Sequence, residues 1–129
     1  MMNDRIRILV GYDDSLQSKK ALKEAITIAN HFSGFIKVVN VYESGKKREA
    51  EATILEAEQN LEQEKVAHDS LLVLGSNPAK TLVIMAKQEN FDLIAVGSRG
   101  LGRNVSMLLG SVSKQVVSNA YCNVLVVKK

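Results

Sequence analysis

The sequence predicts an α/β fold, in which a single domain holds a doubly wound, five-stranded parallel sheet with helices on both faces. Most of its five short aliphatic runs lack apolar/polar alternation, which is typical of strands buried on both faces of a sheet. Segments with apolar residues at helical spacing separate the runs, and this alternation predicts parallel strands joined by right-handed crossovers. A length of 129 residues suits one core, so we expect one domain over residues 1–129.

Strands and helices are predicted in the order βαβαβαβαβ. The strands are expected at residues 6–10, 35–42, 71–74, 93–96 and 124–127. Asp14 followed by Gln17 resembles a capping box that opens the first helix, and Pro78 suits the first turn of the third helix. The apolar stripes that predict the four helices are Leu22, Ala25, Ala29 and Phe32; Ala50, Ile54, Ala57 and Leu61; Ala79, Leu82, Val83 and Ala86; and Val105, Leu109, Val112, Val116 and Ala120.

Charge and composition limit the classes of partner. The formal net charge is +3, and the basic residues are scattered, so we expect no nucleic-acid binding, which needs a concentrated basic patch. Cys122 is the only cysteine, which excludes an internal disulfide and fits a reducing compartment. No apolar stretch approaches a signal peptide or the ~18 residues of a membrane span. We therefore expect a cytoplasmic protein that does not bind membranes.

The least ordinary segment follows the fourth predicted strand. Four of the eight glycines fall within fourteen positions there, at Gly97, Gly100, Gly102 and Gly110. Glycine allows close backbone approach, and free N–H groups before a helix that begins near Ser111 and Ser113 would form an anion-binding concavity. A flexible connection with capping serines is the alternative, and glycines alone would favour it. The segment is neither a Walker loop nor a Rossmann fingerprint.

The acidic pair Asp13–Asp14 suggests a competing interpretation, the metal site of a phospho-accepting receiver domain. That domain needs an aspartate after its third strand, and residues 75–78 of this chain contain none, so the interpretation is set aside. His31 and His68 (expected just before the third strand) are interpreted as surface or packing residues, and Cys122 as a buried thiol. No catalytic set emerges. Slow phosphoryl transfer stays open, because Asp13 beside a bound triphosphate could hold Mg²⁺.

At these residues the sequence resembles the universal stress protein family, and specifically its ATP-binding branch. The family's nucleotide motif is Gly, two residues, Gly, nine residues, then Gly-Ser/Thr. Gly97, Gly100, Gly110 and Ser111 match it at full spacing. The stretch from Val10 to Ser15 is similar to the family's opening strand and turn, and residues 122–127 look like its closing strand.

The resemblance implies a strand order and a set of site residues. The order 3-2-1-4-5, that of an adenine nucleotide alpha hydrolase-like fold, would bring Asp13 to the glycine-rich segment. It implies ATP as the ligand, with Mg²⁺ or Mn²⁺, and places Asp13 near the ribose or the metal. Val41 would contact the adenosine together with Asp13. The remaining residues implied are Val96, Gly97, Arg99 and Gly100 along the nucleotide, and Gly110, Ser111, Val112 and Ser113 at the phosphates.

The resemblance also implies a function and an assembly. We expect a homodimer that pairs through its last strand, from Val124 to Val127, and works as a nucleotide-dependent regulatory module in stress responses, not as a fast enzyme. The alternatives are a protein of this fold that binds no nucleotide and acts through protein contacts, and a slow ATPase or self-phosphorylating protein. Two departures from the family are the short connection after Tyr42, which would leave the adenine less enclosed, and Asn123 in place of a frequent proline.

Overall fold

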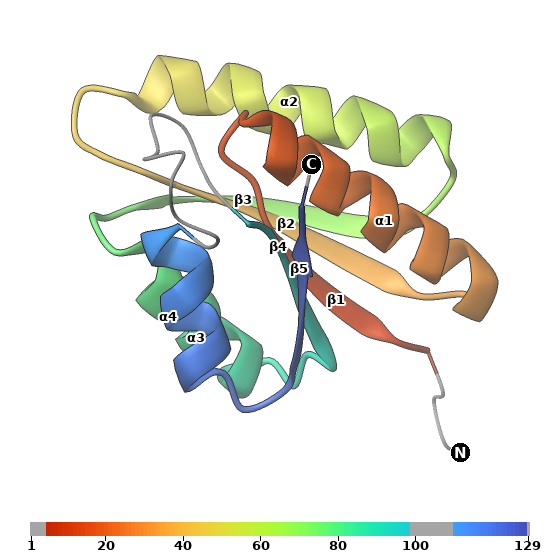
Figure 1. The fold of residues 1–129 in the computed structure, drawn as a ribbon. Helices are drawn as coiled ribbons and strands as arrows, with labels where there is room; N and C mark the ends of the chain where they lie inside the picture. Colours follow the sequence, from red (N-terminus) through yellow and green to blue (C-terminus); the bar gives the residue numbers. More distant parts are fainter. Residues whose placement is uncertain (1–4, 99–109, 129) are drawn as a thin grey trace.

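The computed structural model describes residues 5–98 and 110–128, which form a five-stranded sheet covered by helices (Figure 1). Every strand pair is parallel, and the strand order is β3-β2-β1-β4-β5. The predicted fold class and strand order are confirmed. The elements are β1 (Arg7–Gly11), α1 (Leu16–Phe32), β2 (Phe35–Tyr42), α2 (Lys47–Gln63), β3 (Ala67–Leu74), α3 (Pro78–Gln88), β4 (Leu93–Gly97), α4 (Ser111–Asn119) and β5 (Asn123–Val127).

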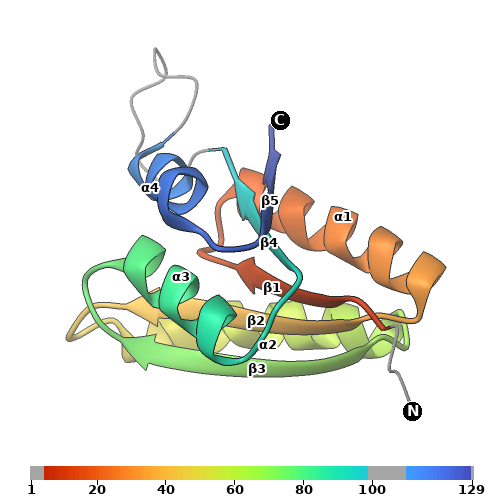
Figure 2. The same ribbon diagram turned by 90° about the horizontal axis from the view of Figure 1, so that it is seen from below.

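The helices form two layers, one on each face of the sheet. Helices α1 and α2 lie together on one face, and α3 and α4 on the other (Figures 1 and 2). Alternate residues of β1 serve the two faces: Ile8 and Val10 pack in the α1/α2 core, whereas Leu9 packs in the α3/α4 core. All three are fully buried, because the central strand of a doubly wound sheet has no solvent-facing side.

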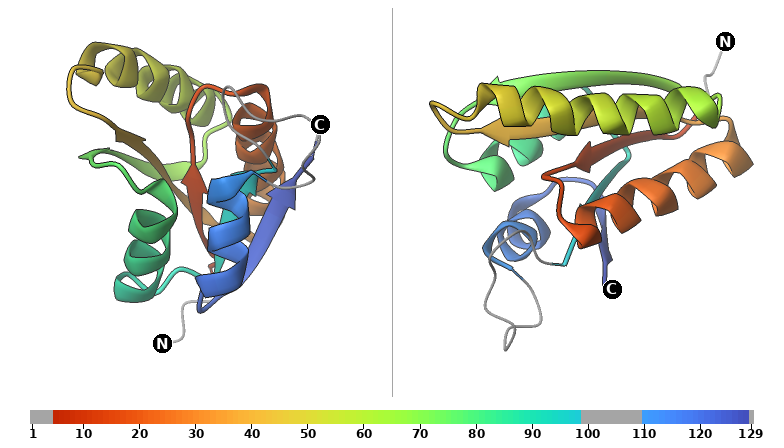
Figure 3. Two further views of the ribbon diagram at one scale, coloured as in Figure 1. Left: turned by 60° about the vertical axis from the view of Figure 1, so that its left-hand side comes forward. Right: turned by 90° about the horizontal axis from the view of Figure 1, so that it is seen from above.

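The chain reverses its direction of progress across the sheet between β1 and β4. From β1 the chain moves outward through β2 to β3, and it then returns to place β4 on the other side of β1, as the two views in Figure 3 show. Val10 is in register with Ala95, so the segments that follow β1 and β4 leave the sheet side by side. In such sheets ligands bind at this point, beyond the carboxyl ends of the strands.

Strand β3 differs from the prediction. It begins at Ala67, not at residue 71, and its first residues pair with β2 although they are polar. Periodicity missed them because β3 is an edge strand with alternating exposure, not a strand buried on both faces. His68 therefore lies within β3, where its Nδ1 is 2.7 Å from the carbonyl oxygen of Val66.

The helix boundaries bring a second set of corrections. Ser15, not Asp14, is the N-cap of α1, because its side chain accepts the amide of Ser18. Phe32 ends α1 with 63% of its surface exposed and is not part of the core. Pro78 opens α3 as predicted. Of the residues predicted for the last helix, Val105 and Leu109 lie outside the described residues.

Within residues 5–98 and 110–128, no helix has the length and apolar character needed to cross a membrane.

Candidate functional site

A cleft opens at the carboxyl ends of β1 and β4, where the strand order reverses. Its volume is about 190 Å³, below the roughly 300–1,000 Å³ common for small-ligand pockets. A ligand as large as a nucleotide would therefore be only partly enclosed by the described residues. The lining residues are Gly11, Tyr12, Asp13, Ser15, Ser18, Val39, Val41, Pro78, Leu82, Val96, Gly97, Gly110, Ser111, Val112 and Ser113.

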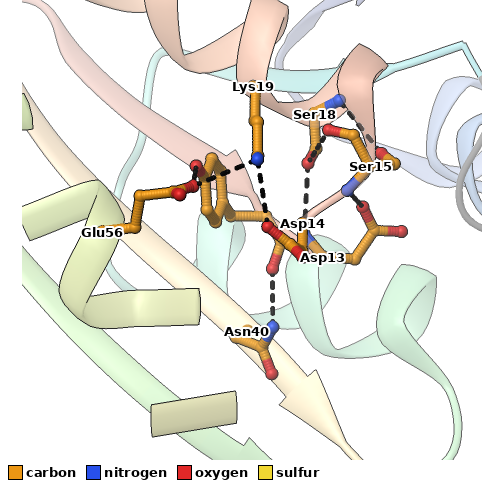
Figure 4. Close-up of polar contacts among 8 residues, drawn as sticks. Asp13, Asp14, Ser15, Ser18, Lys19, Asn40 and Glu56 are labelled. Carbon is orange, nitrogen blue, oxygen red and sulfur yellow. Dashed lines mark hydrogen bonds and ion pairs between the residues drawn. The ribbon is translucent and has the colours of Figure 1, made fainter. Parts of the chain in front are cut away.

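The turn after β1 carries the carboxylate of the cleft. The backbone amide of Ser15 donates to Oδ1 of Asp13 at 3.0 Å, and the amide of Asp13 donates to Oγ of Ser18 at 3.3 Å (Figure 4). Among the described residues, no group donates a hydrogen bond to the second carboxylate oxygen of Asp13. Asp13 is exposed, so this oxygen is available to a hydroxyl or a cation.

The start of α4 forms the opposite wall. Gly110 is the N-cap, so the first amides of α4 have no partners within the helix. Ser113 is 1% exposed, and its hydroxyl lies 2.7 Å from the carbonyl oxygen of Ser98 and 3.2 Å from that of Gly110, so its proton is directed to the backbone. Ser111 is exposed. Of these two serines, Ser111 is the one whose hydroxyl makes no hydrogen bond to the described residues.

Gly97 has a packing reason to be glycine. A Cβ on this residue would lie 2.6 Å from Cβ of Gln17 and 2.7 Å from its backbone carbon. Because those atoms belong to the first turn of α1, a side chain at Gly97 would push α1 away from the end of β4. The glycine spacing predicted a close approach of ligand at Gly97, but no local pattern indicates its contact with α1.

The floor of the cleft is apolar. Val39 and Leu82 are buried in the α3/α4 core, and Val41 packs at its edge. Pro78, in the first turn of α3, also lines the cleft. One cleft therefore joins an aliphatic surface, a carboxylate and the N-terminus of a helix.

One ionisable group beside the cleft is strongly perturbed. Burial, followed by a hydrogen bond to Glu56, raises the pKa of Tyr12 well above its ordinary value, so its hydroxyl stays protonated at physiological pH. Tyr12 therefore acts as a hydrogen-bond donor at this site and not as a base. The part of the chain that the structure describes contains no group of three or more His, Cys, Asp or Glu side chains that could hold a metal ion.

The sequence model of the universal stress protein family matches residues 5–128. The chain belongs to this family. A universal stress protein from Thermus aquaticus is 35% identical over 133 residues, which cover 94% of this chain and 97% of that protein. The family membership inferred from the glycine motif is thus confirmed.

Solved structures agree with the fold of this universal stress protein. The protein MJ0577 aligns with a TM-score of 0.88 over 98% of both chains, and its 24% identity makes it evidence of fold alone. A universal stress protein in complex with cAMP aligns with a TM-score of 0.79 and 27% identity over 97% of this chain and 98% of that one.

The structure brings most of the predicted site residues of this universal stress protein into one cleft. Arg99 and Gly100 lie outside the described residues. The binding roles of the others stay predictions. Those that line the cleft are Asp13, Val41, Val96, Gly97, Gly110, Ser111, Val112 and Ser113.

Sequence reasoning missed several residues of the cleft. Val39 and Leu82 carried no distinguishing signal, because they also fit the core patterns of a strand and a helix. Ser15 and Ser18 had a usable signal, since a serine pair at a helix start favours capping and a turn. The order of strands was also needed to bring α3 to the cleft, and periodicity does not supply that order.

Proposed function

We propose that this universal stress protein binds an adenine nucleotide, with ATP as its principal ligand, in the cleft between β1 and β4. The observation that carries the proposal is the joining of an apolar floor, the Asp13 carboxylate and the N-terminus of α4 in one cleft. A nucleotide presents an apolar ring, sugar hydroxyls and an anion in sequence. The three parts of the cleft match these three groups.

The phosphates would lie at the start of α4. Unpaired amides and the helix dipole favour anions there, and the first turn of α4 contains no acidic residue to oppose them. Ser111 offers an exposed hydroxyl beside these amides. Several donors in one place favour a chain of phosphates over one phosphate, which supports ATP over AMP.

The base would lie on the aliphatic floor. Val39 and Val41 present side chains of β2 to the cleft, and Leu82 adds the α3 side. The connection between β2 and α2 spans only residues 43–46, so it offers little chain to cover a base. We therefore expect affinity to come from the phosphates more than from the adenine.

Asp13 suits either a ribose hydroxyl or a phosphate-bound cation. Mg²⁺ is commonly held by one or two carboxylates together with substrate phosphates and water. Asp13 supplies one carboxylate with an uncommitted oxygen, which fits Mg²⁺ (or Mn²⁺) carried in by the triphosphate. When bound, the cation would neutralise phosphate charge beside the acidic turn.

We propose that the nucleotide regulates the protein and is not turned over rapidly. Among the described residues lining the cleft, Asp13 is the only carboxylate, and Tyr12 is held protonated. A second copy of the chain is the proposed partner. Strand β5 is an edge of the sheet, and its aliphatic residues are only partly buried, which suits pairing across a two-fold axis.

Calorimetric titration tests the nucleotide. Protein stripped of nucleotide and shown to be folded is titrated with Mg-ATP and, separately, with AMP. We expect micromolar binding of Mg-ATP and weaker binding of AMP. Absence of heat with both ligands would reject nucleotide binding, and equal affinities would reject the placement of the phosphates at α4.

Two further measurements address turnover and assembly. Phosphate release above background with Mg-ATP, retained through repeated purification, would reject a purely regulatory role. Sedimentation equilibrium is expected to give a dimer, and a monomer at micromolar concentration would reject pairing through β5.

A further inference from the structure

A polar cluster adjoins the cleft and ties α2 to the turn after β1. It consists of Tyr12, Asp14, Lys19 and Glu56, of which the last three are labelled in Figure 4. Glu56 belongs to α2 and does not line the cleft. The cluster therefore offers a contact between the proposed binding site and a distant helix.

Glu56 is linked to both chain neighbours of Asp13, directly to Tyr12 and through Lys19 to Asp14. It accepts a 2.8 Å hydrogen bond from the Tyr12 hydroxyl, and its carboxylate lies 3.4 Å from the ammonium of Lys19. Lys19 in turn pairs with Asp14 at 3.2 Å. Asp13 thus stands between two residues that are both held by one carboxylate of α2, one directly and one through a lysine.

The backbone of this turn needs such support. Asp14 has a φ of 70°, in the left-handed region that non-glycine residues seldom occupy. Hydrogen bonds to β2 hold the backbone of Tyr12. Its amide donates to the Val39 carbonyl at 3.0 Å, and its carbonyl accepts from Nδ2 of Asn40 at 2.8 Å. The side-chain contacts of Glu56 with Tyr12 and Lys19 add restraints on the residues before and after Asp13.

We propose that Glu56 is a positioning residue for the nucleotide site, acting through Tyr12 and Lys19 to fix the turn that aims the Asp13 carboxylate into the cleft. The inference rests on the proposed nucleotide binding. Glu56 touches no part of the ligand. It sets the direction of the uncommitted oxygen of Asp13, and thereby the affinity for a ribose or for phosphate-bound Mg²⁺.

The other end of the sheet supplies a matched control. Glu89 also forms an ion pair with a lysine, since its Oε1 lies 3.0 Å from Nζ of Lys37. The exposed fractions of the two glutamate side chains are similar, 40% for Glu89 and 47% for Glu56. Glu89 follows α3 and does not line the cleft. Replacing either glutamate by alanine removes an ion pair of the same kind, but only Glu56 contacts the turn.

The experiment compares Mg-ATP affinity in Glu56→Ala, Glu56→Gln, Glu89→Ala and the parent. We expect Glu56→Ala to weaken binding by about three- to tenfold, which lies within the range of couplings carried by residues without ligand contact. Glu56→Gln retains an oxygen acceptor for the Tyr12 hydroxyl and is expected to recover part of this loss. Glu89→Ala should stay within about twofold of the parent.

Two results would overturn the positioning role. One is parental affinity in Glu56→Ala, and the other is an equal loss in Glu89→Ala, which would reveal a general effect of stability. An NMR comparison of the nucleotide-free proteins separates this proposal from the proposed function. The amide signals of Asp13 and Ser15 should shift in Glu56→Ala and not in Glu89→Ala, whether or not the parent binds nucleotide. Unmoved signals would reject the hold of Glu56 on the turn.

Discussion

The two ends of the parallel sheet are built from the same strands but differ in how their polar groups are used. At the amino end, the guanidinium of Arg7 lies 5.1 Å from the ring centre of Phe35 and 4.6 Å from that of Phe91. It also donates to the Glu89 carbonyl at 3.2 Å, and Glu89 pairs with Lys37. Arg7, Lys37 and Glu89 thus all have partners within the protein at this end.

The carboxyl end leaves part of its polar capacity uncommitted. One oxygen of Asp13 receives no hydrogen bond from the described residues, and the first amides of α4 face the cleft without helical partners. We therefore infer that the amino end serves stability, whereas the carboxyl end is the one proposed to hold a ligand.

Gly97→Ala is expected to have the largest effect on this comparison. Its Cβ would meet Gln17 at 2.6 Å and backbone atoms of α1 below 3.0 Å. We expect the free energy of unfolding to fall by about 3 kcal/mol, the upper part of the overpacking range. Urea denaturation measures it. Gly75→Ala is the control, because its Cβ would lie 3.5 Å from Val41 and cost less than about 0.5 kcal/mol. Equal losses would show that the α1 contact is not what requires glycine.

Gly110→Val probes the carboxyl end at a buried glycine whose backbone conformation suits valine. Gly110 has φ −75° and ψ 171°, an extended conformation that valine adopts readily. The branched side chain would stand among the amides proposed to bind phosphates. We expect at least a hundredfold loss of Mg-ATP affinity, roughly 2.7 kcal/mol, with a folded protein. Calorimetry measures the affinity, and circular dichroism checks the fold. Parental binding would show that the phosphates lie elsewhere.

Arg7→Ala probes the amino end and is expected to have the smallest effect of the three. Loss of the contacts with Phe35 and Phe91 should lower the free energy of unfolding by about 1–2 kcal/mol, as for two cation–π contacts. Mg-ATP affinity should not change, since Arg7 is at the opposite end of β1 from the cleft. Denaturation and calorimetry on one preparation test both statements. Weakened nucleotide binding in Arg7→Ala would contradict the separate roles inferred for the two ends of the sheet.

The fold was largely predictable because its signals are local. The apolar stripes of α2 and α3 consist of residues that are all buried in the structure. Pro78 correctly marked the start of α3. Prediction failed where tertiary contacts override a local pattern: pairing with β2 extended β3 over polar residues, and Asp14 turned left-handed so that Ser15 became the cap of α1.

The candidate site was also predictable from the sequence only in part. The spacing of Gly97, Gly110 and Ser111 could be read from the sequence, and it led to the family. The commitment of the Ser113 hydroxyl to the backbone could not, because it depends on the carbonyl of Ser98 at the far end of the intervening segment.

The sequence by itself determined the fold class, the order of elements and the membership of the universal stress protein family. Periodicity and motif spacing are properties of neighbouring residues, so one chain suffices to show them. Only the tertiary structure decided that Gly97 must leave room for α1, and that Glu56 holds Tyr12 directly and Asp14 through Lys19. Tyr12 and Glu56 are 44 positions apart, and no local pattern records which distant side chains the folding of a sheet brings within hydrogen-bond distance.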